Sequence, residues 1–462
     1  MKLYNTLART KETFTTLEPH KVKMYTCGLT VYSHPQIGNW VAYIYSDVLH
    51  RVLLAEGYQV NRVQNITDVG HLVSDDDAGE DKMEKGARAE GTTAWDVADK
   101  FIKIADEEAY NKLKLLRPSK LVRATSLIDE QINFVKGLEE KGYTYIIDDG
   151  VYFDTSKLDD YGKLAQLDIG GLEAGSRVDI GGKKSLTDFA LWKFSAKDKK
   201  RDMEWKSPWG KGFPGWHLEC SVIARENLGD QIDIHTGGID HIPVHHTNEI
   251  AQTESLTGKK PFSRFWFHNN FIKVDGAKLG KSLNNSYLLS DIEKHGFSLE
   301  AFKLLVLSSH YRTEGNFTWE ILEASQNRLN NWQASADLIW QPNARHSRNG
   351  RNPVGQNILK QLQDDIIDRL EDDLDTPDAL IVVDKFLETN ITTNDSLEII
   401  DKLLGINLAT PDITTDQKSL IAERELAREA KDWQKSDELR GKLKSQGIEV
   451  KDTDHGPIWS RA

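Results

Sequence analysis

The sequence contains 462 residues, of which 39% are hydrophobic and 28% are charged. This length and composition predict a globular protein of roughly two to four domains. The formal net charge of −13 argues against a protein that coats nucleic acid without sequence preference, because such proteins usually present a basic surface; a local basic surface is still compatible with it.

The sequence also argues against a membrane or secreted protein. No apolar run approaches the roughly 18–20 residues that a membrane-spanning helix requires, and the first residues, MKLYNTLARTKETF, lack the apolar core of a signal peptide. Cys27 and Cys220 are the only cysteines, so a disulfide framework is not expected. We therefore expect a cytoplasmic protein without a membrane partner.

The first elements predicted, in chain order, form a β-α-β unit within residues 20–70. KVKMYTC is a short apolar strand, and YQVNRVQNI is a second one. Between them, apolar residues recur at the spacing of a helix that Gly57 ends: Val41, Ile44, Val48 and Val52. A β-α-β unit favours a parallel sheet covered by helices.

Residues 72–210 are expected to form an insertion in this sheet. They begin with a charged stretch and continue with helical patterns over 94–117 and 124–141. KGYTYIIDDGVYFDT follows, and its Asp-Asp-Gly predicts a hairpin turn. Residues 211–310 return to alternating strands and helices. QIDIHTGG predicts a strand that ends in a glycine loop, and HHTNEIAQTESLTG predicts a helix.

From about residue 300 onward the pattern is almost wholly helical. Polar stretches with Gly, Pro and Asn predict linkers at 343–355 and 403–417. The sequence thus predicts a helical bundle at 311–402 and a small C-terminal unit at 403–462.

Four residues are candidate metal ligands. His245 and Glu249 are four residues apart in a predicted helix, so their side chains leave the same face. With Cys27 and Cys220 they would form a tetrahedral zinc site. His246 and Glu249 form a competing pair, and the HExxH spacing of metalloproteases is absent. Spacing alone also allows two small buried cysteines and an ordinary polar helix start.

Two further segments are candidates for nucleotide binding. HTGGIDH (235–241) ends a strand with glycines that allow a ligand to approach the backbone. DGAKLGKSLNN places Lys278 and Lys281 in a loop rich in Gly, Ser and Asn, where lysine charge and backbone donors can meet phosphate. A P-loop is excluded because it needs one more residue before Gly280-Lys281. The alternative is a solvated basic loop.

Together these segments resemble the cysteinyl-tRNA synthetases, a class I aminoacyl-tRNA synthetase family. CGLTVYSHPQIGNW (27–40) resembles the segment with the first zinc cysteine and the HIGH signature, and KLGKS (278–282) resembles the KMSKS signature. Other matching segments are QNITD (64–68), PGWHLECS (214–221), DIHTGGIDHIPVHHTNEIAQ (233–252) and the anticodon-domain pattern at 427–453. The resemblance extends over essentially the whole chain in one order.

The resemblance implies a fold and an activity. The fold would be α/β, with a Rossmann-like parallel sheet in the catalytic domain at 1–71 and 211–310, an insertion at 72–210, an all-α bundle at 311–402 and a small anticodon-binding domain at 403–462. The activity would be the activation of L-cysteine by ATP and Mg²⁺ to cysteinyl-adenylate, followed by transfer to the 3′ end of tRNA-Cys. A monomer is expected.

The resemblance also assigns residues to roles. One Zn²⁺ per chain would bind Cys27, Cys220, His245 and Glu249. The amino acid would be enclosed by Thr67, Trp216 and His235. ATP would meet Gly38, Gly237, Gly238, Asp240, Lys278 and Lys281, and the catalytic groups would be Gln36, Asn39, Lys278 and Lys281. The tRNA would contact Arg428, Trp433 and Asp437.

Two departures from the family pattern concern catalysis. Gln36 stands where the first histidine of HIGH is expected, and Leu279 and Gly280 replace Met and Ser in the second signature. A glutamine amide donates a hydrogen bond but has no charge. Losing a charged donor would cost on the order of 1–3 kcal/mol in the transition state, which is roughly a tenfold to hundredfold loss of rate. His34 is an alternative donor or a surface histidine.

Three other interpretations are open at this point. A different ATP-dependent cysteine ligase could share the catalytic domain, although residues 403–462 would then be superfluous. A catalytically weakened or inactive paralogue would explain Gln36 and Gly280. A structural zinc protein without catalysis would leave the glycine and lysine loops unexplained.

Overall fold

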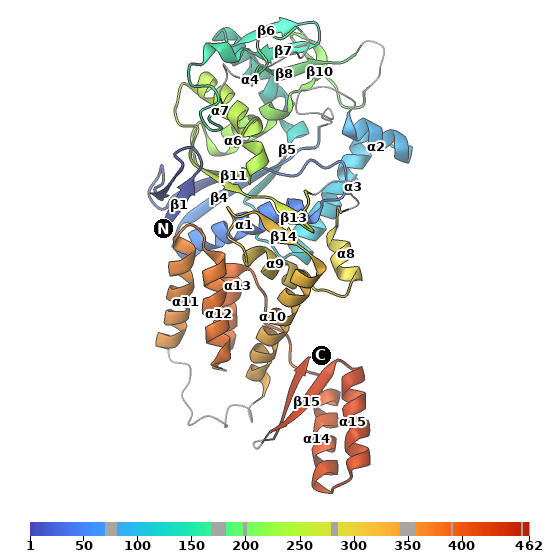
Figure 1. Ribbon diagram of the computed structural model, residues 1–462. Helices are drawn as coiled ribbons and strands as arrows, with labels where there is room; N and C mark the ends of the chain where they lie inside the picture. The colour runs from blue at the N-terminus through green and yellow to red at the C-terminus, as the bar shows by residue number, and fades with distance from the viewer. Residues whose placement is uncertain are drawn as a thin grey trace. The chain divides into compact units, whose positions relative to one another are not determined.

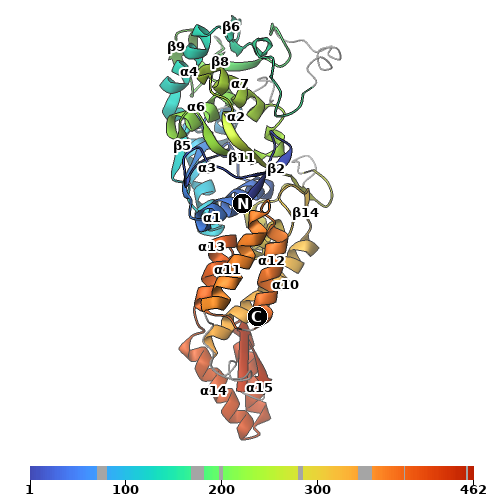
Figure 2. The ribbon, with the colours of Figure 1, turned by 90° about the vertical axis from the view of Figure 1, so that its left-hand side faces the viewer.

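The structure is a computed structural model that describes residues 1–69, 81–167, 182–196, 201–278, 285–341, 356–389, 391–453 and 456–461. The chain divides into two compact units. The first contains residues 1–291 and 311–316, and the second contains residues 292–310 and 317–462. Figures 1 and 2 show the elements of both units. No helix in the described ranges is long and apolar enough to cross a bilayer.

A five-stranded parallel sheet is the centre of the first unit. The strand order is β12-β11-β3-β4-β5, and all four pairings are parallel. The strands are β3 (Lys21–Thr26), β4 (Gln59–Ile66), β5 (Lys120–Arg123), β11 (Ile232–Gly238) and β12 (Ser263–Asn269). Helix α1 (Ile37–Ala55) joins β3 to β4, so the predicted β-α-β unit is confirmed.

Helices cover both faces of this sheet. Figure 1 shows α1 on one face and α6 (Trp216–Leu228) and α7 (His245–Thr257) on the other. The apolar residues that predicted α1 are all buried: Val41, Ile44, Val48 and Val52. On the opposite face, Tyr25 and Val63 from the sheet share a core cluster with Ile223 from α6 and Ile250 from α7. The sheet therefore has the double cover that a buried parallel sheet requires.

The insertion contains helices and a second sheet. The chain passes through α2 (Lys82–Glu90), α3 (Ala94–Asp106) and a π-helix (Glu107–Lys112) before β5, and through α4 (Ile128–Glu140) after it. The antiparallel sheet has the order β6-β7-β8-β10-β9. Its strands are β6 (Thr144–Ile147), β7 (Gly150–Phe153), β8 (Phe189–Phe194), β9 (Trp205–Ser207) and β10 (Gly210–Pro214). The predicted hairpin is confirmed, because Ile147 pairs with Gly150.

Two details of the insertion differ from expectation. The helix predicted over 94–117 ends at Lys112, because Lys114 adopts a positive φ of 54° that no α-helix accommodates. β5 lies within the region expected to be an insertion, yet it pairs with β4 in the central sheet. A four-residue strand without a flanking turn motif has too little periodicity to be recognised from sequence.

Smaller elements complete the first unit. β1 (Lys2–Asn5) and β2 (Thr10–Thr13) form an N-terminal hairpin, and β13 (Ile272–Val274) pairs with β14 (Gly315–Phe317). Helix α8 (Leu289–Lys294) follows residues 279–284, which lie outside the described part of the chain and include Gly280 and Lys281.

The second unit is helical up to its C-terminal part. Its helices are α9 (Leu299–Leu307), α10 (Trp319–Asp337), α11 (Gln356–Glu371), α12 (Thr376–Glu388), α13 (Asn394–Leu404), α14 (Thr415–Glu429) and α15 (Trp433–Ser445). The linker predicted at 343–355 lies outside the described residues. The almost wholly helical pattern expected from about residue 300 is interrupted at its end, where β15 (Ile448–Thr453) and β16 (Gly456–Arg461) form an antiparallel hairpin that the sequence did not predict. Its alternating Ile448, Val450 and Trp459 pack against α14 and α15.

One buried carboxylate anchors the central sheet. Asp233 of β11 is 1% exposed. Its Oδ1 accepts a hydrogen bond from the Leu17 N–H at 2.6 Å, and its Oδ2 accepts one from the Lys23 N–H at 2.8 Å. Each carboxylate oxygen thus satisfies a different backbone donor, one of them in the neighbouring strand β3.

We expect Asp233→Asn to lower the free energy of unfolding by roughly 1–3 kcal/mol, because the amide NH₂ would face a buried backbone N–H. Guanidinium unfolding followed by tryptophan fluorescence measures the change. Asp230→Asn is the matched control, because Asp230 makes partly exposed ion pairs with Arg225 and Lys259, which contribute only about 0–1 kcal/mol. Equal effects of the two substitutions would contradict the anchoring role.

Candidate functional site

A cavity of about 700 Å³ opens at the carboxyl ends of the parallel strands. This is the edge at which open α/β sheets bind ligands. It is lined by twelve of the residues singled out from the sequence: Cys27, Gln36, Gly38, Asn39, Thr67, Trp216, Cys220, Gly237, Gly238, Asp240, His245 and Lys278. We call this cavity the cleft. Segments that are far apart in the sequence therefore meet at one place.

The predicted metal ligands lie together beside the cleft. The ligand atoms of Cys27, Cys220, His245 and Glu249 are all within 4.8 Å of one another, and all four residues are buried. The two Sγ atoms are 4.0 Å apart, and His245 Nε2 is 3.0 Å from Glu249 Oε1. Ligands at zinc-bond lengths in a tetrahedron would be about 3.3–3.8 Å apart. The donor set and its spacing therefore fit a zinc ion.

A second set of four residues shares two of these ligands. Cys27, His235, His246 and Glu249 also bring their ligand atoms within 4.8 Å. Cys27 Sγ lies 3.2 Å from His246 Nε2, and His246 Nδ1 lies 2.7 Å from His268 Nε2. Because Cys27 and Glu249 belong to both sets, the two sets compete for one ion.

The set with both cysteines faces the cleft. Cys27, Cys220 and His245 line the cleft, whereas His235 and His246 are 0% exposed and are not among its lining residues. A metal held by the first set could take a ligand from the cleft as an additional partner, as catalytic zinc sites do. Two thiolates also suit zinc better than one.

The electrostatics of the cluster favour a bound cation. Burial and the neighbouring Cys220 raise the pKa of the Cys27 thiol. The hydrogen bond between the two cysteines has the opposite effect on Cys220 and lowers its pKa to about 7. Burial alone would lower the pKa of His245, but Cys220 and Glu249 raise it to about 10. Burial opposes ionisation of Glu249, yet His235 and His245 lower its pKa to about 2. The shifts at His245 and Glu249 have one cause: the buried cluster stabilises a positive charge between its ligand atoms, carried either by a proton on His245 or by a bound metal cation.

His235 contacts Glu249 of the predicted metal cluster but does not line the cleft. Its Nε2 lies 2.9 Å from Glu249 Oε2, and its ring stacks on Trp266 with 4.5 Å between centroids. The family resemblance assigned His235 to the amino-acid pocket, and the structure shows in addition that its imidazole contacts the Glu249 carboxylate. Trp216 and Thr67, the other two residues of that group, line the cleft, and the Trp216 ring lies 4.6 Å from that of His245.

The signature turn meets the cleft at the start of α1. Gln36 is the N-cap residue of α1, and its N–H donates to Asn39 Oδ1 at 2.8 Å. His34 is exposed, packs its ring edge against Phe101 and also lines the cleft. The N–H of Ile37 donates to the Tyr287 carbonyl and that of Asn39 to the Gln36 carbonyl, so the positive end of the helix dipole is the feature of this turn that favours an anion such as phosphate.

The two glycines at the end of β11 leave no room for a side chain. A Cβ on Gly237 would lie 2.6 Å from the ring of His246, and one on Gly238 would lie 2.3 Å from Asp240 Oδ1. Lys278 lines the cleft and lies 5.6 Å from the Phe271 ring. Lys281 lies outside the described residues.

Sequence reasoning missed several residues of the cleft. Asn65, Tyr43 and Phe271 line it as well. Asn65 lies within the matching segment QNITD and the other two lie near recognised segments, but none of them had been assigned a role. Tyr43 lies in the second turn of α1, and its hydroxyl donates to the Cys27 carbonyl at 3.1 Å. It therefore fixes the backbone of a predicted zinc ligand.

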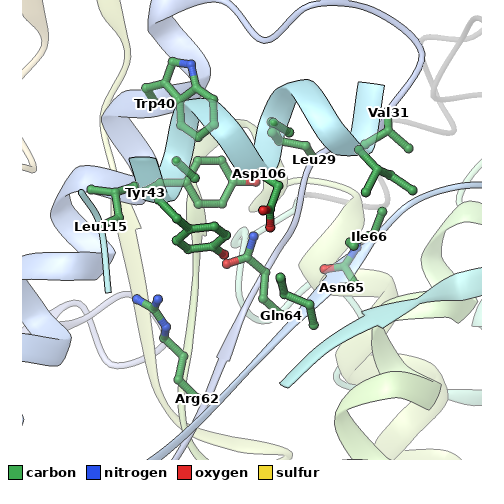
Figure 3. Close-up of a pocket in the computed structure, with 15 residues that line it drawn as sticks. Leu29, Val31, Trp40, Tyr43, Arg62, Gln64, Asn65, Ile66, Asp106 and Leu115 are labelled. Carbon is green, nitrogen blue, oxygen red and sulfur yellow. The ribbon is translucent and has the colours of Figure 1, made fainter. Parts of the chain in front are cut away.

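A second, smaller cavity lies behind the wall of the cleft. Figure 3 shows it between Tyr43, Arg62, Gln64 and Asp106. Its volume of about 50 Å³ holds only a few water molecules. This volume is far below the roughly 300–1,000 Å³ of typical ligand pockets.

The residues expected to contact tRNA lie together in the second unit. Trp433 at the start of α15 is 57% exposed, and the Arg428 guanidinium lies 5.8 Å from its ring. Arg428 also pairs with Asp452 at 3.1 Å. Asp437 is exposed one turn further along α15. An exposed tryptophan beside an arginine is a suitable platform for stacking an unpaired base.

Comparisons with known proteins agree with these features. Residues 13–327 match the family model described as tRNA synthetases class I (C) catalytic domain, and residues 410–459 match the cysteinyl-tRNA ligase anticodon binding domain. The cysteine–tRNA ligase 1 of Burkholderia lata is 43% identical over 99% of this chain and 96% of that protein. The cysteine–tRNA ligase of Treponema denticola is 38% identical over 100% of this chain and 99% of that protein.

Solved structures show the same fold at low sequence identity. The methionyl-tRNA synthetase of Mycobacterium tuberculosis in complex with methionyl-adenylate superposes with a TM-score of 0.57 at 13% identity. The match covers 84% of this chain and 88% of that one.

The two ligand sets make opposite predictions for adjacent histidines. We expect His245→Gln to weaken zinc binding at least about tenfold, and His246→Gln to change it less than about threefold, because only His245 belongs to the set with both cysteines. Zinc per chain by mass spectrometry and the thiolate absorption of a cobalt-substituted protein measure this. Cys220→Ser should remove about half of that absorption; the opposite ranking of the two histidines would favour the second set.

Proposed function

This chain belongs to the class I cysteinyl-tRNA ligase family, and we propose that it forms cysteinyl-adenylate from L-cysteine and ATP and transfers cysteine to tRNA-Cys. One observation supports this above the others. Cys27, Cys220, His245 and Glu249 gather beside a cleft whose other wall contains a helix N-terminus and Lys278. A site for a thiol and a site for a triphosphate thus adjoin.

The cluster accounts for selection of cysteine over serine. The two amino acids differ by one atom, and a hydrophobic pocket separates such a pair only weakly. A zinc ion, when bound by these four residues, would supply a preference for thiolate sulfur over hydroxyl oxygen. Trp216 and Thr67 would enclose the amino acid beside it, which makes an editing site unnecessary.

The other residues of the cleft would stabilise the phosphate groups. The cysteine carboxylate attacks the α-phosphorus, and pyrophosphate leaves with the electron pair of the broken bond. The carboxylate is already ionised, so no general base is needed. The start of α1, the Gln36 amide, Asn39 and Lys278 would hold the phosphate oxygens as charge develops, with Lys281 as a further donor. Mg²⁺ would enter with ATP.

The remaining parts of the proposal concern organisation and setting. Residues 1–71 and 211–310 would form the catalytic domain around an insertion at 72–210, with a helical bundle at 311–402 and an anticodon-binding domain at 403–462. We infer one zinc ion per chain, a monomer and a cytoplasmic location. Gln36 supports a second candidate, a catalytically weakened paralogue.

Cysteine-dependent exchange between ATP and pyrophosphate, followed by charging of tRNA-Cys, tests the proposal. Exchange with cysteine and not with serine, together with charging, is expected. Exchange without charging would favour another cysteine ligase. Absence of exchange from the zinc-loaded protein would favour a binding role.

Gln36→His tests whether the signature turn is weakened. We expect the rate constant of pyrophosphate exchange to rise about tenfold, because a charged donor stabilises phosphate oxygens more strongly than a neutral amide. His34→Gln is the matched control and should change the rate less than about twofold, since His34 packs against Phe101. An unchanged rate in the Gln36 variant would mean that the turn works equally well with a neutral donor.

Trp433→Ala tests the C-terminal unit separately. We expect the affinity for tRNA-Cys to fall roughly tenfold or more through lost stacking, with no change in pyrophosphate exchange. Filter binding and charging kinetics measure this. Leu426→Ala is the control, because Leu426 is 64% exposed but offers no ring for a base. Equal losses in both variants would contradict stacking on Trp433.

A further inference from the structure

Asn65 connects the metal cluster to the substrate pocket. It is the second-last residue of β4, is 1% exposed and lines the cleft. Its Oδ1 accepts a hydrogen bond from the Gly28 N–H at 2.6 Å, and its Nδ2 donates to Thr67 Oγ1 at 2.9 Å. Gly28 directly follows the predicted zinc ligand Cys27, so one side chain contacts both parts of the site.

The orientation of the Asn65 amide is fixed by chemistry. A backbone N–H can only donate, so the atom that faces Gly28 must be the amide oxygen. The atom that faces Thr67 is then the NH₂ group, which can only donate. A flipped amide would place a donor against a donor at Gly28 in a buried place, which is costly.

This orientation determines the direction of the Thr67 hydroxyl. Because Thr67 Oγ1 accepts from Asn65, its own proton must point elsewhere. The Thr67 backbone is already engaged, since its N–H donates to the Leu29 carbonyl and its carbonyl accepts from the Val31 N–H. Among the described residues, no side-chain or backbone acceptor takes the hydroxyl proton. Thr67 lines the cleft, so its proton is available to a ligand there.

We propose that Asn65 is a positioning residue that makes the Thr67 hydroxyl a hydrogen-bond donor to an anionic or carbonyl acceptor of the bound amino acid. The assignment rests on the proposed function, which places the amino acid beside Thr67. The same amide holds the backbone after Cys27, so the direction of the donor and the position of a metal ligand are set together.

Asn65→Asp reverses the polarity of this contact with little change in shape. One carboxylate oxygen still accepts from Gly28, but the other is acceptor-only, so the Thr67 hydroxyl must turn its proton towards it. We expect the zinc-loaded Asn65→Asp variant to bind cysteine about tenfold more weakly than wild type. The Thr67→Val variant, which lacks the hydroxyl, should show the same loss. Thr67→Ser keeps the hydroxyl and should bind within about twofold of wild type.

The double variant separates this role from a structural or a charge effect. The Thr67→Val variant has no hydroxyl whose direction Asn65→Asp could reverse. Adding Asn65→Asp to it should therefore lower the affinity for cysteine by less than about twofold. A general effect of the new charge would persist in that background and multiply the two losses to about a hundredfold. Calorimetric titration with L-cysteine, together with zinc per chain and melting temperature, measures all four states of the cycle.

Three outcomes overturn the assignment. Multiplicative losses in the cycle exclude the polarity switch. Unweakened cysteine binding by Thr67→Val excludes the donor even where the Asp variant does not fold. If the zinc-loaded wild-type protein does not bind cysteine, the proposed function is wrong and this assignment with it. If the wild-type protein binds cysteine but the losses of the two single variants multiply in the double variant, only this assignment is wrong.

Discussion

The structure depends on bringing four ligand groups from three distant segments to one buried point. Cys27 follows β3, Cys220 lies within α6, and His245 and Glu249 lie on α7, yet their ligand atoms are within 4.8 Å. Two thiols, an imidazole and a carboxylate without a cation would be costly to bury. A parallel sheet with two helices packed on one face solves the geometric problem, because its strand ends and helices converge at one edge. The phosphate-facing turn of α1 starts from that same edge.

The sequence predicted the local parts of this arrangement because they follow short periodicities. The spacing of Val41 to Val52 predicted α1, and the four-residue interval from His245 to Glu249 predicted a shared helix face, which their 3.0 Å contact agrees with. Nothing local connects Cys220 to α7, so that proximity came from the family resemblance. β5 was missed because it has only four residues, and the C-terminal hairpin because its first strand, IEVKDT, has only two alternating apolar residues before it becomes charged.

The surroundings of His235 show a different limit of sequence reasoning. The family resemblance assigned His235 to the amino-acid pocket but could not supply its other contacts, because side-chain direction alternates along a strand and its neighbours are distant in sequence. His235 points into the sheet–helix interface, where it meets Glu249 and stacks on Trp266. Asn65 lies in the matching segment QNITD but was given no role, since asparagine in a strand has no characteristic pattern. Its importance comes only from the two partners that the fold places on either side of it.

The close approach of Gly28 to β4 explains why the metal ligand Cys27 and the Asn65–Thr67 pair depend on each other. A Cβ at this position would lie 1.7 Å from the Asn65 carbonyl oxygen, a distance that only a shift of the backbone could relieve. The loop after β3 therefore lies directly against β4, and the Gly28 N–H can reach the Asn65 side chain. The Cys27 N–H is bound by the Thr236 carbonyl and its own carbonyl by Tyr43, so Cys27 is held from three sides. A larger residue at position 28 would displace the Cys27 thiol and release the amide that orients Thr67, so metal binding and recognition of the amino acid share a single steric requirement.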